Sequence, residues 1–176
     1  MHHVVKYEDE NMNGTGESRN LSIEPATHEH VCDILEIWKE LMDFHKALDP
    51  LFSRSSSGHI HMGTYIHDLI DQEDTQVYVA IQEGTVVGYA ISQIRQRPPV
   101  FEESTYGIIS DLAVTASCRR KGIGGALVDA MFEWFRRQGV ERIELQVASR
   151  NEVAYSFWKK HGFADFKHIL YTIKST

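Results

Sequence analysis

The sequence has few cysteines and no long apolar run. Its 176 residues include only Cys32 and Cys118, too few to cross-link a chain of this length, and such scarcity is typical of proteins in a reducing compartment. No window comes near the roughly 18 uninterrupted apolar residues that a membrane span needs, and residues 1–20 lack a basic region followed by an apolar stretch. We therefore expect a cytoplasmic protein that is neither secreted nor inserted in a membrane.

A positive net charge is also missing. Lys and Arg number 18 against 25 Asp and Glu, so the formal net charge is -7. A chain this acidic repels a polyanion unless its basic residues gather on one face, and we expect no nucleic-acid partner. The alternative is a nucleic-acid module built on the basic residues Arg119, Arg120, Lys121, Arg136 and Arg137.

What the sequence does contain is the composition of one globular domain. Apolar residues make up 42% and charged residues 24%, which is enough apolar material to bury a core, and the length suits a single domain. Residues 1–20 hold few aromatic or β-branched side chains, so we expect them to form a flexible acidic tail. The single domain is then expected over residues 21–176.

The hydrophobic patterns of the first half alternate between strand and helix. Thr27 is a cap residue before a helical stripe, and Gln82, Glu83 and Gly84 form a short turn between two β-rich runs, which predicts a hairpin. The expected elements are a strand at 21–24, a helix with the stripe Val31, Leu35, Trp38 and Met42, a loop at 45–58, a weaker helix at 62–70 and hairpin strands at 76–81 and 85–94.

The second half predicts a densely apolar strand followed by helix, strand, helix and strand. The central strand is expected at 106–114. The helix after it has Leu127, Met131 and Trp134 on one face and ends at Gly139. A strand at 142–147, a helix at 151–161 and a last strand at 166–173 are expected to follow. A helix between two buried strands is typical of a parallel crossover. The fold class is therefore expected to be α/β, with a central mixed β-sheet flanked by helices.

Residues 119–125 (RRKGIGG) lie where the central strand turns into a helix. Glycines let the main chain approach a ligand, and consecutive amides at a helix N-terminus stabilise an anion such as a phosphate. A Walker loop does not fit because the lysine precedes the glycines, and a dinucleotide fingerprint would need a glycine at Leu127. The alternative is a solvated basic turn.

Two motifs in this half carry a family resemblance. Arg119, Gly122 and Gly124, after the strand end DLAV, match a signature of Arg or Gln followed by x-x-Gly-x-Gly or Ala. A second motif, N-x-x-A-x-x-F-Y-x-x-x-G-F, is matched by Asn151, Ala154, Phe157, Gly162 and Phe163. With these residues the sequence resembles the GNAT superfamily of acetyl-coenzyme A-dependent N-acetyltransferases, and the resemblance is specific from about residue 106 to residue 163.

The resemblance implies a GNAT-like fold, acetyl-CoA as co-substrate, and transfer of the acetyl group to a primary amine of a small molecule or peptide by direct attack. Main-chain groups at the end of the central strand would pair with the pantetheine arm, amides of the glycine-rich loop would hold the pyrophosphate, and Asn151 would bind the cofactor arm, act as a helix cap, or both. The implied cofactor-binding residues are Leu112, Ala113, Val114, Arg119, Arg120, Lys121, Gly122, Ile123, Gly124, Asn151 and Trp158.

Trp158 departs from the family pattern, which usually has a Tyr that protonates the departing thiolate. An indole N–H does not serve as a general acid. Tyr155 lies one helical turn earlier, but we interpret it as a core residue. The substitution motivates an alternative function, a non-catalytic acyl-CoA binding or sensing domain.

The general base is expected near the start of the central strand, at Glu103 or Tyr106, although Glu103 could instead belong to a solvated loop. We expect Asp111 to be structural and to form hydrogen bonds with loop amides, and we expect Cys118 to have no catalytic role.

No metal site is expected, because the ligand set around His59, His61 and His67 is incomplete and these are interpreted as solvated loop histidines. Acids expected around the acceptor mouth suggest a cationic acceptor: Asp43, Asp49, Glu102 and Glu103. The family also makes a homodimer possible.

Overall fold

The computed structural model describes residues 5–6 and 20–174. The chain divides into two compact units, Met1–Gln146 and Val147–Thr176. The expected tail of residues 1–20 lies outside the described residues except for Val5–Lys6 and Asn20. No helix in the described part of the chain is both long and apolar enough to cross a bilayer.

The larger unit contains a six-stranded sheet in the order β1-β2-β3-β4-β5-β6. All neighbours are antiparallel except β5 and β6, which are parallel. The expected mixed sheet with one parallel crossover is therefore confirmed. The strands are β1 Val5–Lys6, β2 Leu21–Pro25, β3 Thr75–Gln82, β4 Thr85–Gln96, β5 Thr105–Val114 and β6 Ile143–Leu145.

The hairpin between β3 and β4 is closed by a two-residue turn. Glu83 and Gly84 both have positive φ, 53° and 76°. Positive φ at both central residues is the geometry of a type I′ turn, whose twist matches the flanking strands. The predicted hairpin is confirmed, and β4 extends two residues beyond the predicted end.

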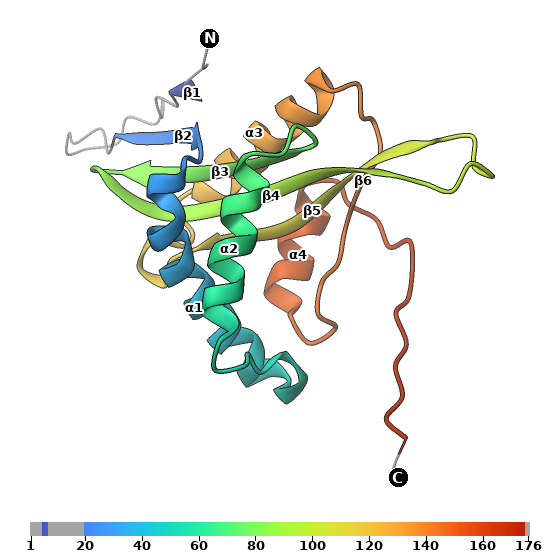
Figure 1. The fold of residues 1–176 in the computed structure, drawn as a ribbon, viewed down its shortest axis with the longest axis horizontal. Helices are drawn as coiled ribbons and strands as arrows, with labels where there is room; N and C mark the ends of the chain where they lie inside the picture. Colours follow the sequence, from blue (N-terminus) through green and yellow to red (C-terminus); the bar gives the residue numbers. More distant parts are fainter. Residues whose placement is uncertain (1–4, 7–19, 175–176) are drawn as a thin grey trace. The chain divides into compact units, whose positions relative to one another are not determined.

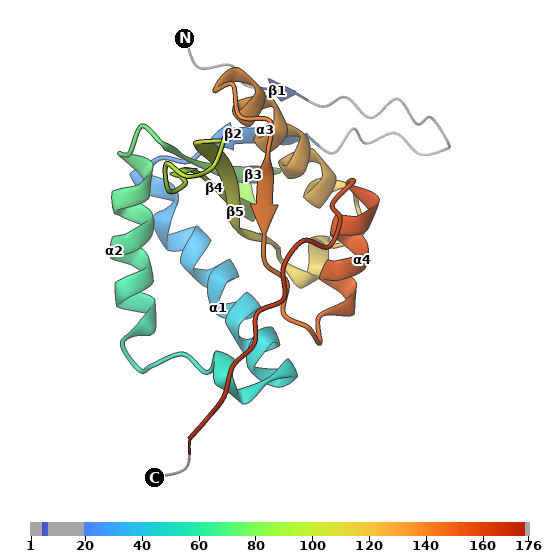
Figure 2. The same ribbon diagram turned by 90° about the vertical axis from the view of Figure 1, so that its right-hand side faces the viewer.

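Helices cover both faces of this sheet (Figure 1, Figure 2). Helix α1 (Val31–Leu48) and helix α2 (Gly58–Ile70) lie on one face, and α3 (Ile123–Arg137) lies on the other. The core under α1 and α2 joins helix residues to alternate strand residues, which is the period-2 pattern of a strand with two buried faces. Its main members are Ile34, Ile37, Trp38, Ile66, Leu69, Val77, Val79, Tyr89 and Ile91.

The predicted loop at 45–58 is partly wrong. Helix α1 continues to Leu48, and Pro50–Phe52 forms a 3-10 turn in which the Asp49 carboxylate accepts a hydrogen bond from the amide of Leu51. The apolar pattern ends after Met42 because the C-terminal end of α1 is largely exposed to solvent. An exposed helical segment does not need apolar residues at helical spacing. Helix α2 likewise begins at Gly58, four residues before the predicted start.

Helix α3 follows the predicted pattern. Its buried face includes the expected Leu127, Met131 and Trp134, together with Phe135. The helix ends at Arg137, and Gly139 adopts φ 69° just beyond it, the left-handed conformation that commonly terminates a helix.

The smaller unit contains one helix, α4 (Glu152–Lys160), which the Asn151 side chain caps by accepting a hydrogen bond from the amide of Ala154 at 3.0 Å. The strand predicted at 166–173 is wrong, since residues 163–174 have no regular secondary structure. The alternating side chains of this segment favour a strand, but a strand also needs a hydrogen-bonding neighbour. The described part of the smaller unit offers none.

Candidate active site

Strand β5 loses its partner on one side part-way along its length. It pairs with β4 to its end, but β6 accompanies it only as far as Ile109. Alternate amides along a strand point to opposite neighbours, and the amide of Thr115 donates to the carbonyl of Val87 on β4 at 2.9 Å. The amides of Leu112 and Val114 therefore point the other way, to an edge that no strand covers within the described residues.

This open edge leads into the N-terminus of α3. Gly122 occupies the N-cap position with φ 82° and ψ −16°, and no side chain of the described chain caps the helix. Arg120 is also left-handed, with φ 60°. The first-turn amides, including those of Ile123 and Gly124, are left without helical acceptors, and amides arranged this way suit an anion. The donor set therefore fits the phosphates of a nucleotide cofactor.

The three cations of the loop have different surroundings. Arg119 donates from Nε to the carbonyl of Val114 at 2.9 Å, and Lys121 donates from Nζ to the carbonyl of Ser117 at 2.8 Å. Both side chains thus fold back on the loop. Arg120 makes no such contact within the described residues and is exposed, so its charge is available to an anionic ligand.

The basic residues considered for nucleic-acid binding are mostly paired with acids. Glu133 forms ion pairs with Arg136 at 2.8 Å and with Arg137 at 3.4 Å, and Arg119 forms one with Glu40 at 2.8 Å. Paired charges offer little net field to a polyanion.

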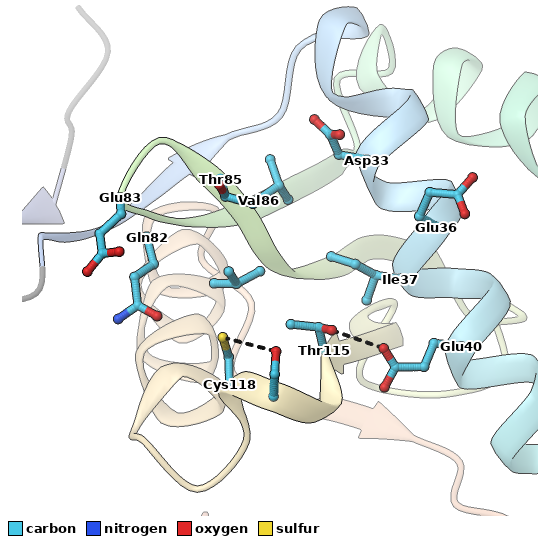
Figure 3. Close-up of a pocket in the computed structure, with 12 residues that line it drawn as sticks. Asp33, Glu36, Ile37, Glu40, Gln82, Glu83, Thr85, Val86, Thr115 and Cys118 are labelled. Atoms are coloured by element: carbon cyan, nitrogen blue, oxygen red, sulfur yellow. Dashed lines mark hydrogen bonds between the residues drawn. The ribbon is translucent and has the colours of Figure 1, made fainter.

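A cavity of about 530 Å³ lies beside the loop, between α1 and the β3–β4 hairpin (Figure 3). Its wall includes four carboxylates, which would repel the phosphates of a cofactor. Cys118 also borders it, and its sulfur lies 3.7 Å from the Ser117 hydroxyl. The acidic side chains of the wall are Asp33, Glu36, Glu40 and Glu83.

Asp111 lies on β5 immediately before the open edge. It pairs with Ile91, so its side chain shares the sheet face that α1 and α2 cover. Burial raises the pKa of its carboxyl from 3.8 to about 7. Burial, and secondly the charge of Asp111, raise the pKa of Tyr89, whose hydroxyl has no hydrogen-bond partner within the described residues. A carboxyl that titrates near neutrality can take up and release a proton under ordinary conditions.

The expectation that Asp111 bonds loop amides is wrong. Within the described residues its carboxylate accepts no hydrogen bond from the loop, and Glu40 accepts the bond from the Ala116 amide instead, at 2.8 Å. The side chain of Asp111 is held on the buried sheet face by the strand register, whereas the loop begins beyond Val114.

Glu103 and Tyr106 lie toward the other end of β5. The Glu103 carboxylate pairs with Nη1 of Arg142 at 3.6 Å, and the Tyr106 ring lies 4.6 Å from the guanidinium carbon of Arg97. A strand rises about 3.4 Å per residue, which places Tyr106 roughly 27 Å along β5 from Val114. The structure does not bring these two residues to the glycine-rich loop, and their catalytic role stays a prediction.

Comparison with known proteins identifies the chain. The family model described as "Acetyltransferase (GNAT) family" matches residues 35–163, which include most of α1, the open edge of β5, the loop and α4. The chain belongs to the GNAT acetyltransferase family. The motifs at Arg119–Gly124 and Asn151–Phe163 that suggested it therefore lie within the matched region.

Curated relatives cover only parts of this GNAT chain. It is 33% identical over 99 residues to the L-amino acid N-acetyltransferase AaaT of Escherichia coli, a match over 54% of this chain and 57% of the relative. The chain thus spans about half the length, or less, of the first curated relatives it matches.

Solved structures share the GNAT fold over most of the chain. A variant of the BH1408 protein from Bacillus halodurans is 22% identical, with a TM-score of 0.79 over 86% of this chain and 99% of that one. The aminoglycoside N-acetyltransferase AAC(6')-Iy, solved with CoA, is 18% identical, with a TM-score of 0.67 over 92% and 99% of the two chains. At these identities the likeness shows the fold alone.

In the smaller unit of this GNAT protein, Trp158 is buried and Tyr155 is not. The Trp158 ring lies 5.0 Å from that of Phe157 and 5.2 Å from that of Phe163, centroid to centroid. Tyr155 is 44% exposed, and its hydroxyl donates to Oδ2 of Asp165 at 3.1 Å. The interpretation of Tyr155 as a core residue is therefore wrong, because its phenol has a polar partner at the surface.

The acids predicted around an acceptor mouth are largely engaged. Asp43 forms an ion pair with Arg54 at 2.8 Å, and Asp49 accepts a hydrogen bond from the amide of Leu51 at 3.0 Å. The ion pairs of Asp43 and Glu103 thus offset two of the four negative charges on which the cationic acceptor was predicted.

Among the residues that the structure describes, two histidines lie close to an acid. His59 and His61 are exposed on α2 and not in a loop as predicted. His28, His67 and Asp71 bring ligand atoms within 4.8 Å of one another. The rings of His28 and His67 are stacked 3.9 Å apart and within 8° of parallel, so one ion cannot lie in both ring planes, as imidazole ligation requires. This arrangement does not fit a metal.

The sequence analysis named Asp111 but interpreted it as structural, and it did not single out Glu40. Asp111 carried a further signal, because an acid inside a densely apolar strand is a candidate for a perturbed carboxyl. Glu40 carried none, since an acid on the polar side of an amphipathic helix is ordinary. Only the packing of α1 beside the loop reveals its contacts.

Proposed function

We propose that this GNAT protein is an acetyl-CoA-dependent N-acetyltransferase that acts on a primary amine of a small molecule or peptide. The single observation that carries the proposal is the continuity of two donor sets: the uncovered β5 edge at Leu112 and Val114, followed by the uncapped N-terminus of α3. The two free cysteines support a reducing compartment, and we place the enzyme in the cytoplasm.

The donor sets divide the cofactor between them. The amides of Leu112 and Val114 would hold the pantetheine arm as an added strand, with Ala113 between them. Amides from Arg119 to Gly124 would hold the pyrophosphate, with the Arg120 side chain adding charge from the solvent side. Acetyl-CoA supplies an activated acetyl thioester, and an amide directed at its carbonyl oxygen would stabilise charge that develops there.

Direct attack by the amine needs positioning and a proton acceptor. We assign the acceptor role to Asp111 in preference to Glu103 or Tyr106, because it directly precedes Leu112 on β5 and the pKa of its carboxyl is about 7. Asp111 would take the proton that the nitrogen loses, and no covalent enzyme intermediate is required.

The function is tested by CoA release from acetyl-CoA with a panel of amines. The panel includes polyamines, aminoglycosides, peptide N-termini, lysine peptides and free L-amino acids, the last because AaaT is named for them. Turnover on any member supports the enzyme. Thermal stabilisation by acetyl-CoA without turnover on any amine would favour the alternative, a non-catalytic sensor.

The proposal names no binding partner other than the amine acceptor. Neither nucleic acid nor membrane is invoked, and a homodimer stays a prediction that light scattering at working concentration can decide.

A further inference from the structure

The carboxylate of Glu40 on α1 binds the loop that joins β5 to α3 (Figure 3). Its Oε1 accepts hydrogen bonds from the amide of Ala116 and from Nη2 of Arg119, both at 2.8 Å, and its Oε2 accepts one from the hydroxyl of Thr115 at 3.0 Å. Three donors from one loop thus converge on one side chain that lies more than 70 residues earlier in the chain.

Arg119 extends this contact to the end of the strand. Its guanidinium donates from Nη2 to Glu40 and from Nε to the carbonyl of Val114. Arg119 therefore cross-links α1, the loop and the end of β5. A guanidinium held in this way by a carboxylate has little net charge left for a phosphate, and two of its five N–H donors are already engaged.

We propose that Glu40 is a positioning residue for acetyl-CoA and that Arg119 acts through it. Glu40 and Arg119 hold residues 115–119 in one conformation, so that the following amides, from Arg120 to Gly124, point at the pyrophosphate site. The inference rests on the proposed function. It differs from a direct role in which the first Arg of the signature contacts phosphate, and it leaves Arg120 as the cation that faces the ligand.

Three observations favour positioning over a chemical role for Glu40. Both of its oxygens already accept hydrogen bonds from donors of the loop. It lines the acidic cavity between α1 and the β3–β4 hairpin. Its partners are main-chain and short side-chain groups of one loop, which is what ordering a loop requires.

The test measures acetyl-CoA affinity by calorimetry and the steady-state constants of Glu40→Ala, with thermal unfolding as the check on folding. We expect affinity to fall and KM for acetyl-CoA to rise by roughly tenfold, since a loop that must be ordered on binding pays for it in affinity. At saturating acetyl-CoA, kcat should stay near wild type. A fall in kcat with unchanged KM would overturn the proposal, as would unchanged affinity.

The matched control is Glu36→Ala. Glu36 lies one helical turn earlier and borders the same cavity, but within the described residues its carboxylate accepts only from Lys39, at 2.6 Å, and forms no hydrogen bond with the loop. This variant should bind acetyl-CoA as wild type does. If it weakens binding as much as Glu40→Ala, the effect is the loss of charge in the cavity and the proposal is wrong.

The combined variant separates acting through Glu40 from acting on phosphate. If Arg119 acts through Glu40, Arg119→Ala should cost about as much affinity as Glu40→Ala, and the double variant no more than either. Additive losses would overturn this part. Glu40→Gln keeps one acceptor oxygen and should retain intermediate affinity, which also covers the case in which the alanine variant fails to fold. If the wild-type protein itself does not bind acetyl-CoA, the proposed function fails; if it binds and Glu40→Ala binds equally, only this inference fails.

Discussion

Gly107 of β5 lies directly against the ring of Phe135 on α3, and a Cβ at position 107 would come within 2.8 Å of two further ring atoms, Cδ1 and Cζ. Phe135 is fully buried, so the ring has no space into which it could move. The absence of a side chain at Gly107 therefore sets how closely α3 approaches the central strand.

Gly107→Ala should destabilise the protein by about 1 to 3 kcal/mol, because an added methyl in a filled core forces displaced side chains or backbone. Urea unfolding measures the change. Gly58→Ala is the control, since the nearest atom to its Cβ would be at 3.4 Å, an ordinary contact. Equal stability of the two variants would contradict the packing, and Gly107→Ala with Phe135→Leu should recover part of the loss.

Gly124→Glu should abolish acetyl-CoA binding while the protein still folds. The substitution brings a bulky carboxylate to the first turn of α3, where the amides would otherwise meet phosphate. Binding by calorimetry and folding by circular dichroism are the two measurements. Arg120→Ala should weaken binding but not abolish it, and a variant Gly124→Glu with wild-type affinity would refute the phosphate site.

Asp111→Asn should remove a titration from the pH profile of the reaction. If Asp111 accepts the proton, kcat/KM of the wild type rises with pH through about 7, where the pKa of the buried carboxyl lies. The acceptor should be a weakly basic amine that does not itself titrate in this range. Asp111→Asn should lower kcat/KM by at least about 100-fold, whereas Glu103→Gln and Tyr106→Phe should keep the profile; the reverse result would return the role to one of those two.

The same carboxyl predicts how stability depends on pH. Its pKa is raised in the folded protein, so between about pH 4 and pH 7 the folded state holds a proton that the unfolded state has released, and the free energy of unfolding falls as pH rises through that window. The shift from 3.8 to about 7 corresponds to roughly 4 kcal/mol at most. Asp111→Asn should flatten this dependence in urea unfolding at several pH values; an unchanged slope would show that Asp111 is ionised when folded.

Trp158→Tyr and Trp158→Phe should keep turnover at saturating acetyl-CoA, because a thiol with a pKa of about 8.5 can leave without a proton donor. Both should cost roughly 1 to 2 kcal/mol of stability, since a smaller ring leaves space in a buried position. Tyr155→Phe removes the hydroxyl that donates to Asp165. If that variant alone loses most of its turnover and still binds the cofactor, Tyr155 is the proton donor.

The sequence predicts those parts of the fold that depend only on neighbouring residues. Glu83 and Gly84 predict the hairpin because few residue pairs accept two positive φ values, and Gly139 predicts the end of α3 for the same reason. The segment 166–173 was misread because β-propensity says nothing of whether a neighbouring strand is present. The end of α1 was missed where the helix faces solvent and its period disappears.

The candidate site likewise contains one part that the sequence predicts and one part that it does not. Its glycines and cations form a contiguous motif, so their place at the start of α3 was predicted before any contact was known. The roles proposed for Glu40 and Asp111 depend on groups distant in sequence. Glu40 contacts a loop more than 70 residues away, and the pKa of Asp111 depends on its burial. No local pattern encodes such neighbours.

The early end of β6 also provides a reporter that needs no turnover. Amides that face β4, such as that of Ala113, should exchange their hydrogens with solvent slowly at all times, whereas those of Leu112 and Val114 should exchange quickly in the free protein. A ligand that lies along the open edge as an added strand would slow only the second set. Alternating protection along four residues of β5, measured with and without acetyl-CoA, would thus distinguish a cofactor bound in strand register from one held by its phosphates alone.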